Sequence, residues 1–408
     1  MASTSATVPS RAAAYAAAAG AAALTLAVVV YPRSAFEASL DGLRLWFQVV
    51  LPSLLPFFAL AQILMGLGAV HFIGVCLEPL MRPLFRLPGT AAFAVAMGLV
   101  SGYPLGAKVT GDLRRNRLCT VVEAERLVAF ANTADPLFMS GAVAVGMFAQ
   151  PRLGAVLAFA HYASVLLVGL VMRFHGYRWA PPAPPPSGPL LRRALDALYQ
   201  ARLRDGRPFG RLFGDVLRDS MSQMLFIGGT ITLFSVLLQV ATLTGVVHWA
   251  AAHLVTPVLG GLGLDPGMAD GLTAGFFELD LGSRAAAQAA APLLDRAVAA
   301  SAIIAWSGLS VHAQVAAMVH GTGLRMGPYL LARLLHSVLA GVLTVAAFHL
   351  GGSFPTLAPT VGPAGAPGFA ARFLGATLQA VGVALTLLVT GVLWHLLRQG
   401  GRRLFRGR

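Results

Sequence analysis

One acidic residue of the sequence lies inside a segment that is apolar on both sides. It belongs to a polar cluster made of Asn132, Thr133, Asp135 and Pro136. A carboxylate near the middle of a bilayer costs several kcal/mol unless it is paired or hydrated, and Pro136 removes a backbone donor that a helix would need. The cluster predicts a broken helix in which Asp135 meets a cation, a proton or a polar solute. The alternative is a structural polar contact between helices.

A second acidic motif lies in the later half of the chain, where one residue separates Glu278 from Asp280. The residues around this pair are small: Gly275, Gly282 and Ser283. Two acids in one break bounded by glycines indicate a site for a coupling ion or a substrate. The alternative is that the two acids neutralise Arg284 or Arg333.

The segment 89–110 is apolar but has a helix-breaking centre, which consists of Gly102, Tyr103, Pro104 and Gly106. Basic residues lie on both sides of it: Arg82, Arg86, Lys108, Arg114, Arg115 and Arg117. If both basic groups are cytoplasmic, the segment enters the membrane and returns on the same side as a re-entrant hairpin. The backbone groups freed at its centre must then line a cavity or be covered by protein.

Other polar residues on apolar segments have simpler interpretations. We expect His161, His312 and His336 to be packing residues, with a proton relay as the alternative. Cys76 and Cys119 lack the spacing of metal ligands. The sequence has no phosphate-binding loop, no His-Glu-x-x-His and no nucleophile motif. We therefore expect no enzyme, no ATP-driven transport by this chain alone, and no cofactor or bound metal.

Membrane helices are the elements that must hold these residues. The chain has 408 residues, of which 57% are hydrophobic and 11% charged, whereas about a quarter of the residues of a soluble protein are charged. This composition excludes a soluble enzyme, a secreted disulfide scaffold and a disordered chain. Continuous apolar stretches of about twenty residues predict an all-α polytopic membrane protein. The formal net charge of +14 at pH 7 reflects arginines in loops, which indicate topology rather than nucleic-acid binding.

The chain divides into five predicted parts. They are an N-terminal transmembrane helix (1–41), a first repeat (42–173), a cytoplasmic linker rich in proline and arginine (174–217), a second repeat (218–350), and an outer loop with a last transmembrane helix and a basic cytoplasmic tail (351–408). The arginines of the linker and the tail place both termini in the cytoplasm of a multi-pass cell-membrane protein. The basic amphipathic stretch 190–219 is expected on the anionic inner leaflet. The first helix is either retained or a cleaved signal peptide, and its poor cleavage pattern favours retention.

The two halves of the chain resemble each other. Gly98-Leu-Val-Ser-Gly-Tyr aligns with Gly271-Leu-Thr-Ala-Gly-Phe, and Gly106-Ala-Lys aligns with Gly282-Ser-Arg after three inserted residues. Further on, the segment 126–137 matches 296–307. Because each repeat must cross the membrane an odd number of times, the repeats are predicted to be inverted. We expect about eight full crossings and two re-entrant hairpins, and inverted repeats with broken helices are typical of secondary transporters.

Four motifs give the chain a resemblance to a known family. They are Leu51-Pro-Ser-Leu-Leu-Pro-Phe-Phe, Ser101-Gly-Tyr-Pro-Leu-Gly-Ala-Lys, Asn132-Thr-Ala-Asp-Pro-Leu-Phe and Phe276-Phe-Glu-Leu-Asp-Leu-Gly-Ser. Together they resemble the sporulation integral membrane proteins of the nucleoside-recognition, or Gate domain, superfamily, over about residues 40–350. At Asp135 the family pattern has a small polar residue instead.

The resemblance implies a role in making the spore, in the mother-cell or forespore membrane of a Gram-positive spore-former. In concentrative nucleoside transporters, which are distantly related to Gate domains, paired re-entrant hairpins hold the nucleoside and the coupling ion. By this resemblance the candidate site for substrate and ion consists of Gly102, Tyr103, Pro104, Gly106, Asn132, Thr133, Asp135, Pro136, Glu278, Asp280, Gly282 and Ser283.

Three functions stay open at this point. The first is a transporter of a small polar solute, nucleoside-like or ion-coupled, that is needed for spore formation. The second is a non-transporting scaffold or assembly factor for the spore envelope or cortex, and the third is a membrane-embedded enzyme, for which no metal cluster or nucleophile is found. The expected partners are the lipid bilayer, a small polar solute with a coupling ion, and either a second copy or another sporulation membrane protein, but no nucleic acid.

Overall fold

The computed structural model describes residues 11–176 and 188–349. This part of the chain consists of helices joined by short turns, without a strand, which confirms the all-α prediction. The predicted outer loop, last transmembrane helix and tail within 351–408 lie outside the described residues.

The first half of the described chain contains eleven helical elements. In order they are α1 (Arg11–Val30), α2 (Pro32–Leu45), η1 (Trp46–Val50), α3 (Leu51–Gly66), α4 (Ala69–Leu80), η2 (Met81–Phe85), α5 (Ala91–Ser101), α6 (Leu105–Arg115), α7 (Val121–Ala131), η3 (Phe138–Met147) and α8 (Leu153–Met172). A capping box starts α7, because the Thr120 side chain accepts from the Glu123 amide while the Glu123 carboxylate accepts from the Thr120 amide.

The second half contains eleven more elements. They are α9 (Leu190–Asp205), α10 (Phe209–Leu243), α11 (Val246–Ala250), η4 (Ala251–Val255), α12 (Thr256–Gly261), η5 (Pro266–Met268), α13 (Ala269–Phe277), α14 (Leu279–Gln288), α15 (Leu293–Trp306), α16 (Gly308–Met318) and α17 (Met326–His349). The region 174–217, which the sequence assigns to a linker, therefore contains α9 and the first turns of α10.

Within residues 11–176 and 188–349, four helical segments are long and apolar enough to cross a membrane: α8, α10, α15 together with α16, and α17. Two bent pairs, 14–30 with 32–50 and 58–66 with 69–85, raise this number to six if each pair is one span. The predicted transmembrane helices are thus confirmed as a class. The prediction of about eight crossings also counts a segment outside the described residues.

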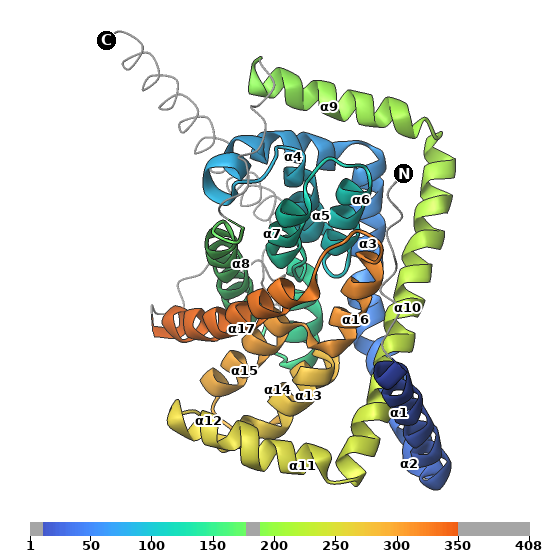
Figure 1. The fold of residues 1–408 in the computed structure, drawn as a ribbon, viewed down its shortest axis with the longest axis vertical. Helices are drawn as coiled ribbons and strands as arrows, with labels where there is room; N and C mark the ends of the chain where they lie inside the picture. The colour runs from blue at the N-terminus through green and yellow to red at the C-terminus, as the bar shows by residue number, and fades with distance from the viewer. Residues whose placement is uncertain (1–10, 177–187, 350–408) are drawn as a thin grey trace, which may run out of the picture.

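The long helix α10 runs along one side of the molecule, and α9 lies across its end (Figure 1). Near the middle, α17 packs against α15, α8 and α7. There the rings of His161 on α8 and His336 on α17 are 4.5 Å apart. Both rings are buried, so α8 and α17 cross in close contact.

Contacts between the two halves come in matching pairs. In the alignment of the repeats, α7 corresponds to α15 and α8 corresponds to α17. The contact of α7 with α17 is therefore the counterpart of the contact of α15 with α8. In the same alignment α6 corresponds to α14 and η3 corresponds to α16. The contact of α6 with α16 is therefore the counterpart of the contact of α14 with η3. These four contacts between the halves therefore form two pairs, and the members of each pair are made by equivalent elements.

Both segments predicted as hairpins form pairs of short helices that pack on each other, α5 with α6 and α13 with α14. The first pair is interrupted at Gly102, whose φ of 69° and ψ of −162° form a conformation that is essentially restricted to glycine. A Cβ atom on Gly98 or on Gly106 would meet the carbonyl oxygen of Ala131. These glycines therefore let the first hairpin lie directly against the end of α7.

Candidate functional site

The break between α7 and η3 leaves backbone groups without helical partners, and buried side chains satisfy them. The Asn132 carbonyl accepts a 2.9 Å hydrogen bond from the Arg333 guanidinium. The Ala134 amide donates to His161 Nε2 at 3.2 Å, and the Ala134 carbonyl accepts from the Tyr162 hydroxyl at 3.0 Å. Irregular backbone at membrane depth is tolerated only where it is covered in this way or lines a cavity.

Asp135 caps the second half of this broken helix. Its Oδ1 atom accepts hydrogen bonds from the amides of Leu137 at 2.9 Å and Phe138 at 2.8 Å. The positive end of a helix dipole favours a carboxylate at this position. The other oxygen, Oδ2, lies on the side of Gly102, where a Cβ atom would approach it to 2.7 Å. The acid thus joins the helix break to the tip of the first hairpin.

The second repeat has an equivalent break between α15 and α16. Ser307 takes the left-handed conformation there, with φ 72°. The last carbonyls of α15 lose their helical partners, and the first repeat supplies new ones: the Tyr103 hydroxyl donates to the Ile304 carbonyl at 3.0 Å. The tip of the first hairpin is therefore fastened to the broken helix of the second repeat.

Arg333 on α17 connects both breaks. Its side chain is fully buried and donates to the carbonyls of Asn132 and Ala305 and, at 2.7 Å, to the Tyr103 hydroxyl. The two carbonyls are at the C-terminal ends of α7 and α15, where a cation is favoured. In the sequence analysis, Arg333 is considered only as a possible counter-ion of Glu278 and Asp280. An arginine inside the apolar segment 328–350 was the signal for a larger role.

Glu278 and Asp280 lie at the break of the second hairpin, and both are buried. Glu278 caps α14, because its Oε2 accepts from the Leu281 amide at 2.8 Å, and its Oε1 is 3.4 Å from the Ser310 hydroxyl. Oδ1 of Asp280 has no hydrogen-bond partner within the described residues. A buried carboxylate oxygen without a donor is costly, so this Asp280 oxygen is a candidate to take up a proton or to bind a cation.

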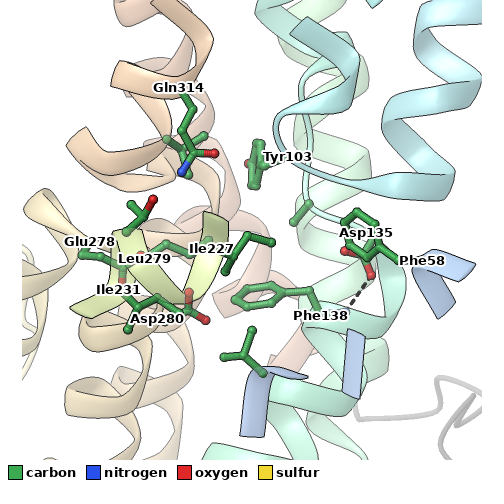
Figure 2. Close-up of a pocket in the computed structure, with 14 residues that line it drawn as sticks. Phe58, Tyr103, Asp135, Phe138, Ile227, Ile231, Glu278, Leu279, Asp280 and Gln314 are labelled. Atoms are coloured by element: carbon green, nitrogen blue, oxygen red, sulfur yellow. Dashed lines mark hydrogen bonds between the residues drawn. The ribbon is translucent and has the colours of Figure 1, made fainter. Parts of the chain in front are cut away.

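A small cavity collects these groups between the two halves (Figure 2). It has a volume of about 50 Å³ and is lined by Val50, Phe58, Tyr103, Ala134, Asp135, Phe138, Ile227, Thr230, Ile231, Glu278, Leu279, Asp280, Val311 and Gln314. Three of the lining residues are acids, and neither lysine nor arginine is among them. The cavity has room for a few water molecules or a small cation, whereas pockets for larger organic ligands measure about 300–1,000 Å³.

The structure distributes the candidate residues over this cavity and its supports. Tyr103, Asp135, Glu278 and Asp280 line the cavity. The remaining candidates lie in the hairpin and helix breaks behind it: Gly102, Pro104, Gly106, Asn132, Thr133, Pro136, Gly282 and Ser283. Among these, Asn132 donates to the Tyr329 hydroxyl at 3.1 Å, and the Thr133 hydroxyl is 2.6 Å from His161 Nε2. Within the described residues, no group of three or more His, Cys, Asp or Glu side chains is placed to hold a metal ion.

Sequence reasoning missed the remaining walls of the cavity. Phe58 on α3 and Ile227 on α10 close it from outside the two hairpins, and Gln314 on α16 supplies an amide. Ile227 and Gln314 are ordinary members of apolar helices in the sequence, and Phe58 ends one of the four family motifs without having been a candidate site residue. Only the packing of α3 and α10 against the hairpins and the helix breaks brings Phe58 and Ile227 to the acids.

Ionic contacts join the two halves again away from the cavity. The Glu125 carboxylate at the start of α7 is fully buried and accepts from Arg325 Nε at 2.8 Å and Nη2 at 2.9 Å, while His175 Nε2 lies 2.7 Å away. Burial alone would raise the pKa of Glu125, but the hydrogen bonds from Arg325 and His175 outweigh it and lower this pKa to about 2. Arg115 on α6 donates to the Met318 carbonyl at the end of α16 at 2.6 Å. The halves are thus tied at this end by charged groups.

Two comparisons with known proteins agree with this architecture. The sequence model of the Gate family, described as nucleoside recognition, matches residues 47–178. The sporulation integral membrane protein YlbJ of Bacillus subtilis (strain 168) is 44% identical over 331 residues, which cover 79% of this chain and 79% of that protein. No solved structure matches the chain. By this identity and coverage, the chain belongs to the family of sporulation integral membrane proteins that contain a Gate domain.

Proposed function

We propose that this protein is a membrane transporter that moves a small polar solute, nucleoside-like or coupled to an ion, through a site at the acidic cavity. The observation that carries the proposal is the cavity itself: buried carboxylates from broken elements of both halves face one space, and no basic residue lines it. Such a space attracts a proton or another cation, because carboxylates removed from water are stabilised by protonation or by a positive ligand. A solute as large as a nucleoside requires the cavity to open.

The matching contacts between the halves support two repeats related by a two-fold axis, and the predicted odd number of crossings in each repeat makes the proposed repeats inverted. A two-fold relation between the repeats makes α7 on α17 equivalent to α15 on α8, and α6 on α16 equivalent to α14 on η3. In transporters with inverted repeats, solute and ion sites lie at the repeat interface, and discontinuous helices form them. The breaks at Asp135, Glu278 and Ser307 fit that description.

The proposed orientation places both termini and α9 in the cytoplasm, since the arginines of 174–217 and of the tail favour that side. The proposed role is in spore formation, and it is supported by the name of the relative, which is a sporulation integral membrane protein. The proposed site residues are those of the two hairpins and of the break at Asp135.

A scaffold or assembly factor is the second candidate function. The observation that favours it is α9, an amphipathic helix at the end of the bundle that exposes arginines and apolar side chains. In that case spore formation depends on α9 and the basic tail and tolerates neutral residues in place of the cavity acids.

Complementation in a sporulating strain that lacks this family member separates the two functions. We would compare wild type with Asp135→Asn, Glu278→Gln and the double variant, and use Asp41→Asn on the exposed face of α2 as the matched control. The transporter predicts loss of heat-resistant spores in the cavity variants at normal protein levels in the membrane, with the control unaffected. Uptake of candidate solutes into vesicles with purified protein would follow. Full complementation by the double variant would refute the ion-coupled site.

A further inference from the structure

A set of ion pairs holds α9 at the N-terminal end of α10. Arg207, in the turn between the two helices, donates to Asp205 at 2.6 Å and to Asp215 on α10 at 3.0 Å. The Arg207 guanidinium also holds the pKa of Asp205 below its usual range. On the other side, Arg193 pairs with the buried Glu78 of α4. The helix is therefore held in one position and does not swing as a free linker.

The length of α10 then indicates where α9 lies relative to the bilayer. α10 has 35 residues, which at 1.5 Å per residue make a helix of about 52 Å. A bilayer is about 40–45 Å thick when its headgroup layers are included. α10 is thus somewhat longer than the bilayer is thick, and α9 lies across its end (Figure 1), so a transmembrane α10 places α9 along the membrane surface, at the outer edge of the headgroup layer.

The side chains of α9 fit this position. One face packs on α4, where Ala194 is fully buried. On the rest of the helix, four apolar side chains at every fourth position remain between 53% and 60% exposed: Leu191, Leu195, Tyr199 and Leu203. We call these four residues the α9 stripe. At the turn into α10, Phe209 and Phe213 continue the exposed apolar surface with 59% and 45% exposure.

Two exposed arginines of α9 are next to stripe residues in the chain, and the second of them, Arg204, also lines a pocket with His71 of α4. Arg193 and Arg202 are used in ion pairs with Glu78 and Asp205. Arg192 and Arg204 are exposed, and neither forms an ion pair in the part of the chain that the structure describes. An amphipathic helix with an apolar stripe and arginines is typical of helices that lie in the bilayer interface, and each basic residue near the surface adds to the attraction to an anionic leaflet.

We infer that α9 is an anionic-lipid binding element: the α9 stripe enters the interface of the bilayer, and Arg192 and Arg204 bind lipid phosphates. This inference does not depend on transport.

Spin labels measure where the stripe lies. In full-length protein with Cys76 and Cys119 replaced by alanine, labels at Leu195→Cys and Tyr199→Cys would be compared with one at Gln200→Cys, an exposed polar position beside the stripe. The vesicles contain phosphatidylcholine with about 30 mol% phosphatidylglycerol, an anionic surface. We expect the two stripe labels to collide with oxygen more than with a water-soluble nickel chelate, and the control label to show the reverse. Stripe labels open to the chelate, or shielded from both quenchers by a second copy or another protein, overturn the inference.

The charge contribution has a separate test. Phosphatidylglycerol added to the purified protein in neutral detergent is expected to raise its thermal midpoint, and Arg192→Gln/Arg204→Gln to reduce that shift at least about twofold, as the loss of two lipid contacts implies. Arg33→Gln/Arg44→Gln, which removes two exposed charges from α2, is the matched control and keeps the shift. Equal shifts in the variant and the control overturn the assignment of these arginines.

Discussion

Replacing Arg333 is the strongest test of how the two helix breaks are held. Arg333→Met keeps most of the apolar volume of the side chain but removes its donors from the Asn132 and Ala305 carbonyls and from the Tyr103 hydroxyl. A buried acceptor left without a partner costs about 1–3 kcal/mol, so the two carbonyls together cost about 2–6 kcal/mol. Three interhelical hydrogen bonds at the average of about 0.6 kcal/mol found in a membrane protein sum to about 2 kcal/mol. Since the variant also removes the cost of burying a charge, we expect a loss of about 2–4 kcal/mol.

A second variant separates the charge from the shape of the group. Arg333→Lys keeps a cation, but a single ammonium group cannot repeat the planar fork that reaches both carbonyls. We therefore expect its free energy of unfolding to lie between those of wild type and Arg333→Met. Because Tyr103 lines the cavity and accepts from Arg333, both variants are also expected to lower activity in the complementation assay.

Unfolding by SDS in mixed micelles, followed by circular dichroism, measures these differences. Arg33→Met on the exposed face of α2 is the control and is expected within about 0.5 kcal/mol of wild type, as for most surface substitutions. The reasoning is refuted if Arg333→Met unfolds like the control. It is also refuted if Arg333→Lys is as stable as wild type, because charge alone would then be sufficient.

Three further predictions follow from local geometry. Gly98→Ala pushes a methyl group into the Ala131 carbonyl and should destabilise the protein by about 1–3 kcal/mol. Gly229 faces open space on α10, so Gly229→Ala should stabilise the protein by up to about 1 kcal/mol. Thermal unfolding of both variants measures the two changes, and equal midpoints would contradict the prediction. Glu125→Gln should lower the free energy of unfolding at pH 7 by about 2 kcal/mol through its lost charged hydrogen bonds. Because the folded pKa of about 2 lies below the ordinary 4.5, that difference is full above pH 4.5 and should vanish as the pH falls through about 2; acid titrations of both proteins test the sign. Burial raises the pKa of the Cys119 thiol to about 12, so maleimide at pH 7 should label it only after unfolding, and rapid labelling of the folded protein would contradict this.

The positions of the breaks could be predicted from the sequence, because breaking a helix requires particular residue types. Gly102 and Pro104 interrupt the first hairpin, and the polar cluster around Asp135 interrupts the helix after α7, where the pattern placed both breaks. The break at Ser307 is different. No proline or acid marks it, and it becomes visible only through the alignment of the repeats and the left-handed backbone of Ser307.

The partners of the charged groups could not be predicted. The alternative interpretation of the sequence pairs Glu278 and Asp280 with Arg284 or Arg333, but the hydrogen bonds of Arg333 in the structure go to the Asn132 and Ala305 carbonyls and to Tyr103. Carbonyl groups at helix ends have no signature in the sequence, since every residue has one. A basic residue at membrane depth therefore identifies a buried polar site without identifying its partner.

The two halves share an arrangement of hairpin and broken helix but carry their capping acids at different elements of it. In the first half the acid caps the second part of the broken helix, at Asp135, while in the second half it caps the second arm of the hairpin, at Glu278. In both cases a helix N-terminus binds one carboxylate oxygen and stabilises its charge. The other Glu278 oxygen is 3.4 Å from the Ser310 hydroxyl, and Oδ1 of the nearby Asp280 has no hydrogen-bond partner in the described chain. The helix ends thus hold the acids in place, while neither lysine nor arginine lines the cavity, so a proton or a cation is the ligand that the proposed ion-coupled site requires.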